Sequence, residues 1–542
     1  MVRIDVFKRQ EMRIPYLSKI LLQLTAAALP LVVSCGKDTQ VKLPSAISDG
    51  MVLQMDSPAK VWGWAQPGSS VKVKWQGKTV KAKAGDDSLF VAVLPSSPSG
   101  GPFTMTIGDK TVSDILVGEV FLCSGQSNME LPVRRCLDAV ADDIKGFSDD
   151  NIRYFGVKRQ YDFAGPMKEL DGKWEKASSE EAIQEWGAVA FFTAKALHEK
   201  TGVPVGMINS AVGGSPIEAW MGEEILPDYA LKELAECRDK HWMDSVLHHN
   251  ATLYSDWQNR HNALPENKAA RWTKVNIFDT SWAKDRKGEN IYGSHLLRKT
   301  VRLTAEQAKG SSILHLGAMV DADSTFINGK YVGNTTYMYP PRNYSVPEGV
   351  LKEGDNLIEI HLYACGGNPA SFVRDKEYSL ETPAGTVSLL QGWEHKDGKR
   401  MPARPGEIFL HYKASGLYNG MIYPLKNYTI GGAMWYQGES NTWNAADYGN
   451  LLTSMIGQWR ETFSSPDLPF YIIELAAFEH SELTDNDFGW NRVQKEQRRT
   501  AEKVEGAYVV PNADLGEWND IHPQDKKTVG ERAVKVILDS RK

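Results

Sequence analysis

The stretch FLCSGQSNMEL, residues 121–131, contains the feature that decides the fold. It begins with apolar, β-prone residues and stops at a Ser-Gly pair, after which come the polar residues Gln126, Ser127 and Asn128. The apolar part predicts a buried strand, and Ser and Asn are favoured where a helix begins. Two interpretations follow: an ordinary strand-to-helix turn with an N-cap, or a nucleophile presented at the C-terminal end of a strand.

The pattern of apolar segments divides the rest of the chain into regions. Short strands with Pro-Gly, Gln-Gly and Gly-Asp turns predict an N-terminal β-sandwich over residues 36–112. Near-continuous apolar strands that alternate with helical segments predict a parallel sheet covered on both faces. This pattern occupies residues 113–265 and returns over 401–542, with helices expected around 448–463 and 490–504. The β-rich stretch 266–400 is therefore expected to be a β-sandwich inserted into one α/β domain.

Composition and charge restrict the functional classes. Of the 542 residues, 42% are hydrophobic and 24% charged, which is typical of a globular protein with substantial cores. The formal net charge of −6 gives no reason to expect nucleic acid as a partner. Cys123, Cys136, Cys237 and Cys365 show no metal-binding spacing. We therefore expect mostly free buried thiols, with one or two disulfides left open, and no metal or other cofactor.

The first 35 residues resemble an export signal. Lys8, Arg9, Arg13 and Lys19 precede a short apolar run over residues 20–33, which ends at Ser34-Cys35. The run is too short and interrupted for a comfortable membrane-spanning helix. Residues 32–35 resemble a bacterial lipobox, so the expectation is an exported lipoprotein of the periplasm or cell surface. Its contact with the membrane would then be a lipid on Cys35, and the alternative is a plain cleaved signal peptide.

Polar motifs follow four of the expected buried strands. Ligands of open parallel sheets bind at the C-terminal ends of the strands, so these motifs are expected to converge. Together they supply a nucleophile, backbone N–H donors, an amide and a base, which are the groups needed for acyl transfer. The four motifs are residues 125–128 (GQSN), 212–215 (VGGS), 438–441 (GESN) and 519–523 (NDIHP).

Within these motifs, Ser127 is the candidate nucleophile and needs a base within hydrogen-bond reach. His522 is the best candidate base of the 12 histidines, because it lies between the last expected strand and the last helix. The N–H groups of Gly213 or Gly214 and the side chain of Asn441 are the candidate oxyanion donors, with the Ser127 N–H. Taken singly, each motif is better explained by a Gly-rich turn or a helix cap; their coincidence at four strand ends favours a catalytic site.

The motifs GQSNM, GGSPIEAW, WYQGESN and DIHP, in this order, resemble the SGNH hydrolase superfamily and specifically its sialate O-acetylesterase family. The resemblance implies a flavodoxin-like three-layer α/β/α catalytic domain. It implies the same roles for Ser127, His522 and the oxyanion donors. The inserted region, with its FINGKYVG segment, looks like a galactose-binding-like β-sandwich.

One position departs from the superfamily pattern, which usually has its acid three residues before the histidine. Here that residue is Asn519, and the acid is Asp520, two residues before His522. The alternatives are that Asp514 or Glu439 orients the histidine, or that a backbone carbonyl fixes its tautomer in a Ser–His dyad. Asp520 is the favoured candidate.

The resemblance implies hydrolysis of O-acetyl esters of a sugar or glycan, most specifically of sialic acid. Candidate substrate-binding residues are Gln126, Arg134 and Glu439, and Arg135 is a further basic candidate for the sialate carboxylate. Acetylxylan or another acetylated polysaccharide is the competing substrate. A non-catalytic, glycan-binding surface lipoprotein is the alternative of a different class. The sequence leaves the oligomeric state open.

Overall fold

The computed structural model describes residues 38–338, 340–366, 369–374, 376–478, 489–517 and 520–542. These residues divide into two compact units. The smaller comprises mainly Lys268–Phe372 and Tyr378–Arg400, and the larger comprises Thr39–Asn267, Val373–Glu377 and Met401–Lys542. The expected signal region, with Cys35, lies outside the described residues. In the described part of the chain, no helix has the length and apolar character needed to span a membrane.

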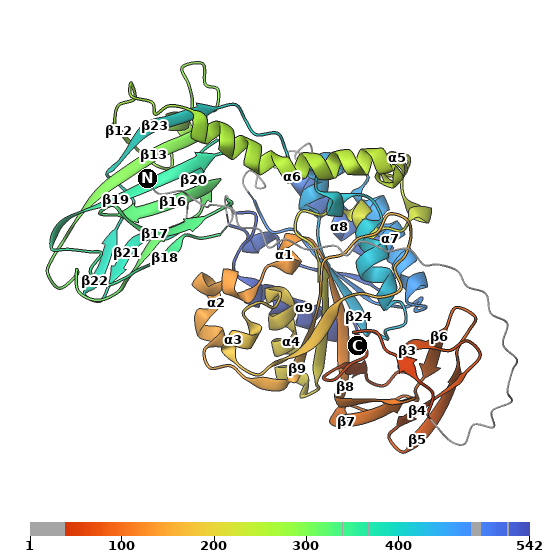
Figure 1. Ribbon diagram of the computed structural model, residues 1–542. Helices are drawn as coiled ribbons and strands as arrows, with labels where there is room; N and C mark the ends of the chain where they lie inside the picture. The colour runs from red at the N-terminus through yellow and green to blue at the C-terminus, as the bar shows by residue number, and fades with distance from the viewer. Residues whose placement is uncertain (1–37, 339, 367–368, 375, 479–488, 518–519) are drawn as a thin grey trace, which may run out of the picture. The chain divides into compact units, whose positions relative to one another are not determined.

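The larger unit is of mixed α/β type, and its largest sheet has the central strand order β10-β9-β11-β8-β24-β25-β26 (Figure 1). All neighbours along this path are parallel except the edge pair β10–β9. Parallel pairing agrees with the near-continuous apolar character of these strands. The strands are β8 (Lys110–Gly125), β9 (Asp149–Val157), β10 (Gly172–Ala177), β11 (Val205–Ala211), β24 (Gly432–Tyr436), β25 (Phe470–Ile473) and β26 (Ala507–Val510).

Strand β8 also continues into the N-terminal β region. Its first half pairs with β2 and β7, and its second half pairs with β11 and β24. The expected boundary between residues 112 and 113 therefore falls inside one strand, because the buried apolar run continues without a turn from Ile115 to Gly125. The N-terminal strands are β1 (Val41–Lys42), β2 (Val52–Gln54), β3 (Lys60–Ala65), β4 (Ser70–Trp75), β5 (Lys78–Lys83), β6 (Leu89–Val93) and β7 (Gly100–Ile107).

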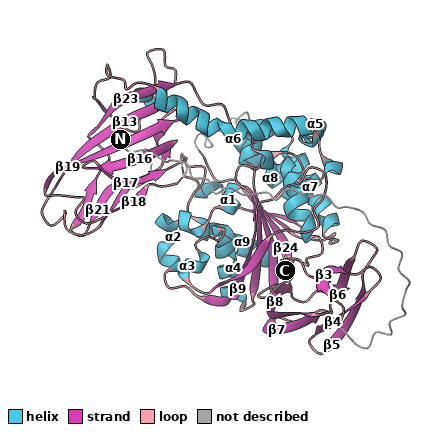
Figure 2. Cartoon of the chain, viewed as in Figure 1, coloured by secondary structure: helices cyan, strands magenta, loops and turns pink. Residues whose placement is uncertain are grey.

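Helices cover both sides of the parallel strands, with α4 and α9 on one side and α7 and α8 on the other (Figure 2). Helix α4 is buried on nearly all sides because it lies between the sheet and α9. The helices expected around 448–463 and 490–504 are confirmed as α7 and α8. The helices of this unit are α1 (Ser127–Glu130), α2 (Leu137–Ile144), α3 (Glu180–Ile183), α4 (Ala188–Thr201), α5 (Asp228–Arg238), α6 (Lys240–Ala263), α7 (Tyr448–Thr462), α8 (Gly489–Lys503) and α9 (Lys526–Asp539).

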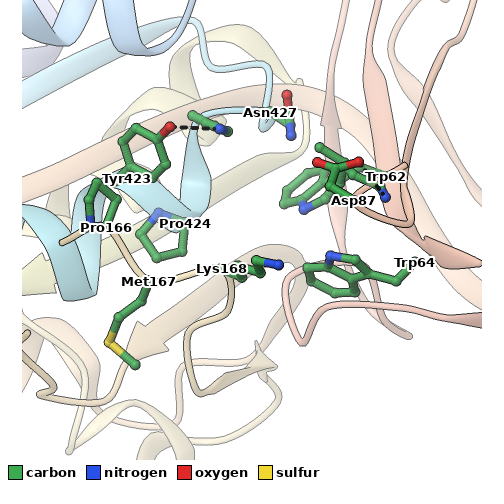
Figure 3. Close-up of a pocket in the computed structure, with 11 residues that line it drawn as sticks. Trp62, Trp64, Asp87, Pro166, Met167, Lys168, Tyr423, Pro424 and Asn427 are labelled. Atoms are coloured by element: carbon green, nitrogen blue, oxygen red, sulfur yellow. Dashed lines mark hydrogen bonds between the residues drawn. The ribbon is translucent and has the colours of Figure 1, made fainter. Parts of the chain in front are cut away.

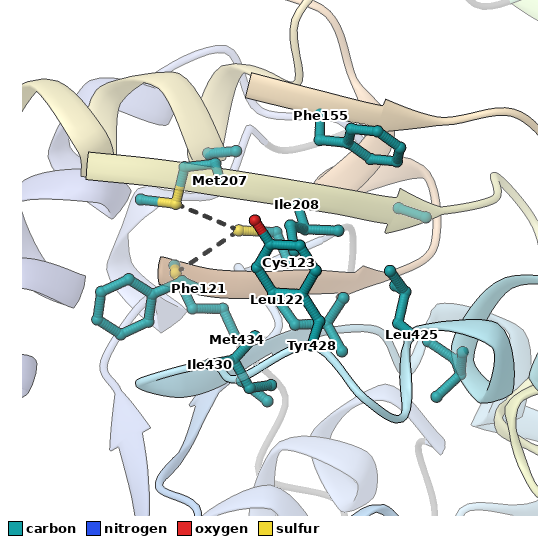
Figure 4. Packing of buried hydrophobic residues seen from close by; sticks show 14 of the residues in the cluster. Phe121, Leu122, Cys123, Phe155, Met207, Ile208, Leu425, Tyr428, Ile430 and Met434 are labelled. Carbon is teal, nitrogen blue, oxygen red and sulfur yellow. Dashed lines mark hydrogen bonds between the residues drawn. The ribbon is translucent and has the colours of Figure 1, made fainter. Parts of the chain in front are cut away.

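The core beneath the strand ends is built around β8 (Figure 4). The Sγ of Cys123 lies 3.7 Å from the Sδ of Met207 on β11 and 4.0 Å from the Sδ of Met434 on β24. Burial raises the pKa of the Cys123 thiol, so this residue acts as a packed apolar group. Cys123, Cys136 and Cys237 are buried free thiols, in agreement with the expectation.

The smaller unit has its own hydrophobic core, which includes Leu297, Leu314, Ile360 and Trp393. Its strands form a six-stranded sheet, a four-stranded sheet and a two-stranded pair. The six-stranded sheet has the order β12 (Thr273–Val275), β23 (Trp393–Met401), β13 (Tyr292–Leu303), β19 (Gly354–Ala364), β16 (Ala322–Ile327) and β17 (Lys330–Thr335). The four-stranded sheet has the order β18 (Asn343–Val346), β14 (Ser312–Leu316), β21 (Tyr378–Thr382) and β22 (Gly385–Ser388). The two-stranded pair is β15 (Met319–Val320) with β20 (Ser371–Phe372).

Candidate active site

Three parallel strands end at the same level, which brings the turns after them together. Gly125 at the end of β8 is in register with Ala211 on β11 and Tyr436 on β24. Gly125 has a φ of +134°, and a Cβ atom there would lie 2.1 Å from the Tyr436 carbonyl oxygen. Only glycine fits this position, so the chain turns sharply and directs Ser127 out of the sheet edge.

The structure brings Ser127 and His522 together. Ser127 is the first residue of α1 and is half-buried, and its Oγ lies 2.8 Å from the Nε2 of His522. Burial lowers the pKa of His522 to about 4, a shift that the Asp520 charge opposes and the Lys526 charge reinforces. The imidazole is therefore neutral at physiological pH and can accept the Ser127 proton.

Asp520 lies beside His522, but the carboxylate is directed to other partners. Its Oδ1 is 3.9 Å from the imidazole Nδ1, which exceeds hydrogen-bond length. The same oxygen accepts the backbone N–H of His522 at 2.8 Å, and Oδ2 lies 2.7 Å from the Nζ of Lys376. Asp520 thus orients the His522 backbone in this arrangement. Asn519, the residue at the usual position of the acid, lies outside the described residues.

The two alternative acids are engaged with other groups. Asp514 forms a two-point ion pair with Arg532, which lowers the pKa of Asp514 to about 2. Glu439 is buried, and its Oε1 accepts a hydrogen bond from the Asn128 amide at 2.6 Å. Of the three candidates, Asp520 is the one with a carboxylate oxygen within 4 Å of the imidazole, at 3.9 Å.

Asn128 has a role that sequence reasoning missed. Its Nδ2 donates to Glu439 and, at 2.9 Å, to the carbonyl of Ile521, the residue before His522. Its Oδ1 accepts from the Nζ of Lys526 at 2.6 Å, and Lys526 is fully buried. The Asn128 side chain therefore ties the nucleophile turn to the histidine segment. The expected side-chain N-cap is absent from α1, whose capping residue Gln126 makes no such bond.

The glycine pair lies next to the nucleophile. A Cβ atom on Gly213 would lie 3.4 Å from the Ser127 Cβ, and the Gly213 N–H donates to Glu130 Oε2 at 2.6 Å. Gly214 has a φ of +76°, and a Cβ there would lie 2.0 Å from the hydroxyl of Tyr412. Because neither glycine has a side chain, their backbone N–H groups can approach the space beside Ser127. The Gly213 N–H is already bonded to Glu130.

Asn441 is placed differently from the sequence expectation. It is fully buried, and its Oδ1 accepts from the Ile217 N–H at 2.9 Å and from the Gln437 amide at 2.7 Å. Its Nδ2 donates to Glu218 at 2.9 Å. No hydrogen bond joins Asn441 to Ser127 within the described residues. The turn after β24 directs this amide inward, where it holds the residues 217–220 in place.

The three candidate substrate-binding residues lie in different surroundings: Gln126 and Glu439 are buried, and Arg134 is exposed. Gln126 is buried, and its Oε1 accepts the Ser440 N–H at 3.2 Å, so it links two turns of the site. Arg134 is exposed and pairs with Glu185 at 2.6 Å. Arg135, by contrast, is near enough to His522 for its charge to lower the histidine pKa. Glu439 is buried against Asn128, where burial raises its pKa to about 7. Gln126 and Glu439 thus support the site from within.

A separate pocket of about 270 Å³ lies elsewhere in the larger unit (Figure 3). Two tryptophans and a tyrosine line it, together with acidic, basic and amide side chains. None of the residues that line it belongs to the four strand-end motifs. The side chains include Trp62, Trp64, Asp87, Lys168, Tyr423 and Asn427.

Comparisons with known proteins identify the family of this chain. A family model described as carbohydrate esterase, sialic acid-specific acetylesterase, matches residues 117–272 and 390–538, more than half of the chain. The sialate O-acetylesterase of Homo sapiens is 30% identical over 216 residues, which are 35% of this chain and 41% of the human protein. The Mus musculus sialate O-acetylesterase is 30% identical over 207 residues, 34% of this chain and 38% of the mouse protein. The matches thus span less than half the length of these relatives.

A solved structure extends the likeness to most of the fold. A carbohydrate acetylesterase from Xanthomonas citri aligns with a TM-score of 0.54 and 23% identity. The alignment covers 92% of this chain and 76% of that protein. Its fold is therefore similar across both units of the chain.

Proposed function

Because this chain belongs to the carbohydrate esterase family of sialic acid-specific acetylesterases, we propose that it hydrolyses O-acetyl esters of sugars, with Ser127 as nucleophile. The observation that carries this proposal is the 2.8 Å contact between Ser127 Oγ and His522 Nε2. A serine is a weak nucleophile unless a neutral base accepts its proton, and His522 meets that condition.

The proposed reaction uses these groups in turn. His522 takes the Ser127 proton as Oγ attacks the acetyl carbonyl, and the resulting oxyanion is held by backbone N–H groups of Ser127 and Gly214. The sugar oxygen leaves with the proton from His522, which leaves an acetyl ester on Ser127. Water then gives a proton to His522 and attacks this ester, releasing acetate and restoring Ser127. Asp520 orients the segment that carries the base.

The finer assignment of the fold belongs to the same proposal. The parallel strand order, with helices on both sides, supports a three-layer α/β/α domain of the SGNH hydrolase type. The antiparallel sheets and separate core of the smaller unit support a galactose-binding-like β-sandwich inserted into it.

The proposed substrate is O-acetylated sialic acid. The family description and the names of the curated relatives support it. Arg135 also supports it as a candidate partner for the sialate carboxylate, because this basic residue lies near enough to His522 for its charge to act on the histidine. Acetylated polysaccharides such as xylan are the competing substrates.

Two assays test the proposal. Wild type should hydrolyse p-nitrophenyl acetate, Ser127→Ala should lose this activity, and Ser148→Ala, at an exposed serine, should retain it. An inert wild type, or equal activity in Ser127→Ala, would contradict the esterase assignment. Acetate release should then be faster from 9-O-acetyl sialate than from acetylated xylan; the reverse order would reassign the substrate and leave the esterase mechanism standing.

A further inference from the structure

A short segment of the inserted region belongs to the larger unit. Val373–Glu377 lies between β20 and β21, two strands of the smaller unit, yet it groups with the residues that form the catalytic site. Within it, the Lys376 side chain is 5% exposed, and its Nζ lies 2.6 Å from Glu517 Oε2 and 2.7 Å from Asp520 Oδ2. The inserted region thus delivers a buried cation to the segment that carries the base.

Lys376 is charged in this position. Burial alone would lower the pKa of its ammonium group, but the pairing with Asp520 and Glu517 outweighs burial and raises that pKa above its ordinary value. The two half-buried carboxylates would repel each other without this cation, and the buried lysine charge would be strongly unfavourable without a partner. The lysine and the two carboxylates therefore hold one another in a defined geometry.

We propose that Lys376 is a positioning residue of the hydrolytic site, which fixes Asp520 beside His522 and balances its charge. This inference rests on the proposed function. Through Lys376 the inserted region takes part in assembling the catalytic site, in addition to any role as a separate module.

The charge of Lys376 also bears on the proton affinity of the base. The charged groups that act on His522 are Asp520, which raises its pKa, and Lys526, Arg135 and Lys376, which lower it. Removing Lys376 leaves Asp520 less compensated, so the pKa of His522 should rise. The acid limb of kcat/KM should then move to higher pH, and a variant that restores the positive charge at this position should move it back.

The test compares Lys376→Met, Lys376→Arg and Lys527→Met in the full-length chain. Lys527 pairs with Asp143 at 2.6 Å, so its variant loses a lysine–carboxylate pair without touching Asp520. We expect Lys376→Met to lower kcat/KM on p-nitrophenyl acetate by about 10- to 100-fold. The acid limb of its pH dependence should lie at higher pH than that of wild type. Lys376→Arg should recover the position of the acid limb, and Lys527→Met should resemble wild type.

The outcomes separate this inference from the proposed function. If wild type is active and Lys376→Met matches it in both rate and acid limb, Lys376 is not a positioning residue. If wild type is inert, the proposed function itself fails. Circular dichroism and thermal melting verify folding, and Lys376→Gln provides the same charge comparison if the Met variant does not fold.

An independent observation in the smaller unit points to a metal site. His295 on β13 and His395 and Asp397 on β23, a neighbouring strand, present donor atoms that all lie within 4.8 Å of one another. His295 Nδ1 is 3.1 Å from His395 Nε2, which is 3.8 Å from Asp397 Oδ1. The spacing of Cys and His along the sequence predicted no such cluster, because the two histidines are 100 positions apart.

The chemistry of the cluster suits a divalent transition metal. The Nε2 of His295 lies 2.9 Å from the Ile291 carbonyl, which can only accept, so Nε2 carries the hydrogen and Nδ1 offers its lone pair to the cluster. The separations of 3.1 Å and 3.8 Å lie on either side of the ligand–ligand separation of about 3.3 Å expected around tetrahedral zinc with ligands at about 2.0 Å.

The geometry points to a zinc-type site in which His295, His395 and Asp397 are three ligands that hold β13 to β23. The test is titration of EDTA-treated, full-length protein with Zn²⁺ by calorimetry and with Co²⁺ by visible absorption. We expect one equivalent to bind and to raise the melting temperature, and both effects to be lost in His395→Ala and Asp397→Asn. His315→Ala, at another histidine near a carboxylate, should retain them. No stoichiometric binding in wild type, or full binding in His395→Ala, would reduce the cluster to a hydrogen-bonded histidine pair.

Discussion

His522 Nε2 lies 2.8 Å from Ser127 Oγ, although 395 positions separate the two residues. The contact joins the turn after β8 to the segment before α9. Asn128 reinforces it, because its amide bonds the carbonyl of Ile521, immediately before the histidine. The nucleophile and the base are therefore held by neighbouring residues as well as by their own hydrogen bond.

The acid dependence of activity should reflect the lowered pKa of His522. The base works only when neutral, and its pKa of about 4 lies below the ordinary value of 6.5. We expect kcat/KM on p-nitrophenyl acetate to stay level from neutral pH downward and to reach half its value near pH 4. Activity recovered after return to neutral pH controls for unfolding. A midpoint at or above 6.5 would contradict the burial of a neutral base.

Asp520→Asn should distinguish Asp520 from Asp514 as the acid that supports His522. The asparagine can still accept the His522 backbone N–H but removes the charge that Lys376 pairs with. We expect kcat to fall by about 100-fold or more. Asp514→Asn is the matched control, and it should leave kcat near wild type because it disrupts only the exposed pair with Arg532. A larger loss in Asp514→Asn would transfer the role to Asp514.

Asn128→Ala should weaken the site without removing a reacting group. It severs the bonds to Glu439, Ile521 and Lys526, and leaves buried polar groups without a partner. We expect kcat to fall by about 10- to 100-fold and the free energy of unfolding to fall by about 1–3 kcal/mol.

The matched control is Asn151→Ala, at an exposed asparagine bonded to Asp149. It should change neither quantity appreciably. If Asn128→Ala lowers stability but leaves kcat unchanged, Asn128 supports the fold and has no part in positioning Ser127.

Gly125→Ala should destabilise the fold at the strand end. The new Cβ would meet the Tyr436 carbonyl at 2.1 Å, and the φ of +134° is unfavourable for alanine. We expect a loss of about 3 kcal/mol or more in urea unfolding. Gly146→Ala has a positive φ but no neighbour within 4 Å, and should cost about 1 kcal/mol. Equal losses of unfolding free energy in the two variants would show that the close approach of residue 125 to the Tyr436 carbonyl has little effect.

The proximity of Ser127 and His522 could be predicted from the sequence because each lies next to a strongly patterned element. Ser127 follows the apolar run of β8, and His522 precedes α9. Both segments follow strands of the same parallel sheet, and the C-terminal ends of parallel strands share one edge.

The supporting groups could not be predicted in the same way, since their roles depend on side-chain direction. Asn441 was expected to face the nucleophile, but its turn directs it to Ile217 and Glu218. Lys526 is fully buried, and nothing in its local sequence distinguishes it from the exposed lysines of a helix. Lys376 contacts Asp520 from the β-rich stretch 266–400, and no periodicity in the sequence predicts that contact.

The most direct test of the central claim is peptide mapping of the adduct formed with a fluorophosphonate, which reacts with activated serines. At neutral pH, wild type should carry a single adduct on Ser127, and the rate of labelling should fall sharply in His522→Ala. The absence of an adduct, or labelling of another serine that persists in Ser127→Ala, would contradict the account of Ser127 as a nucleophile activated by His522.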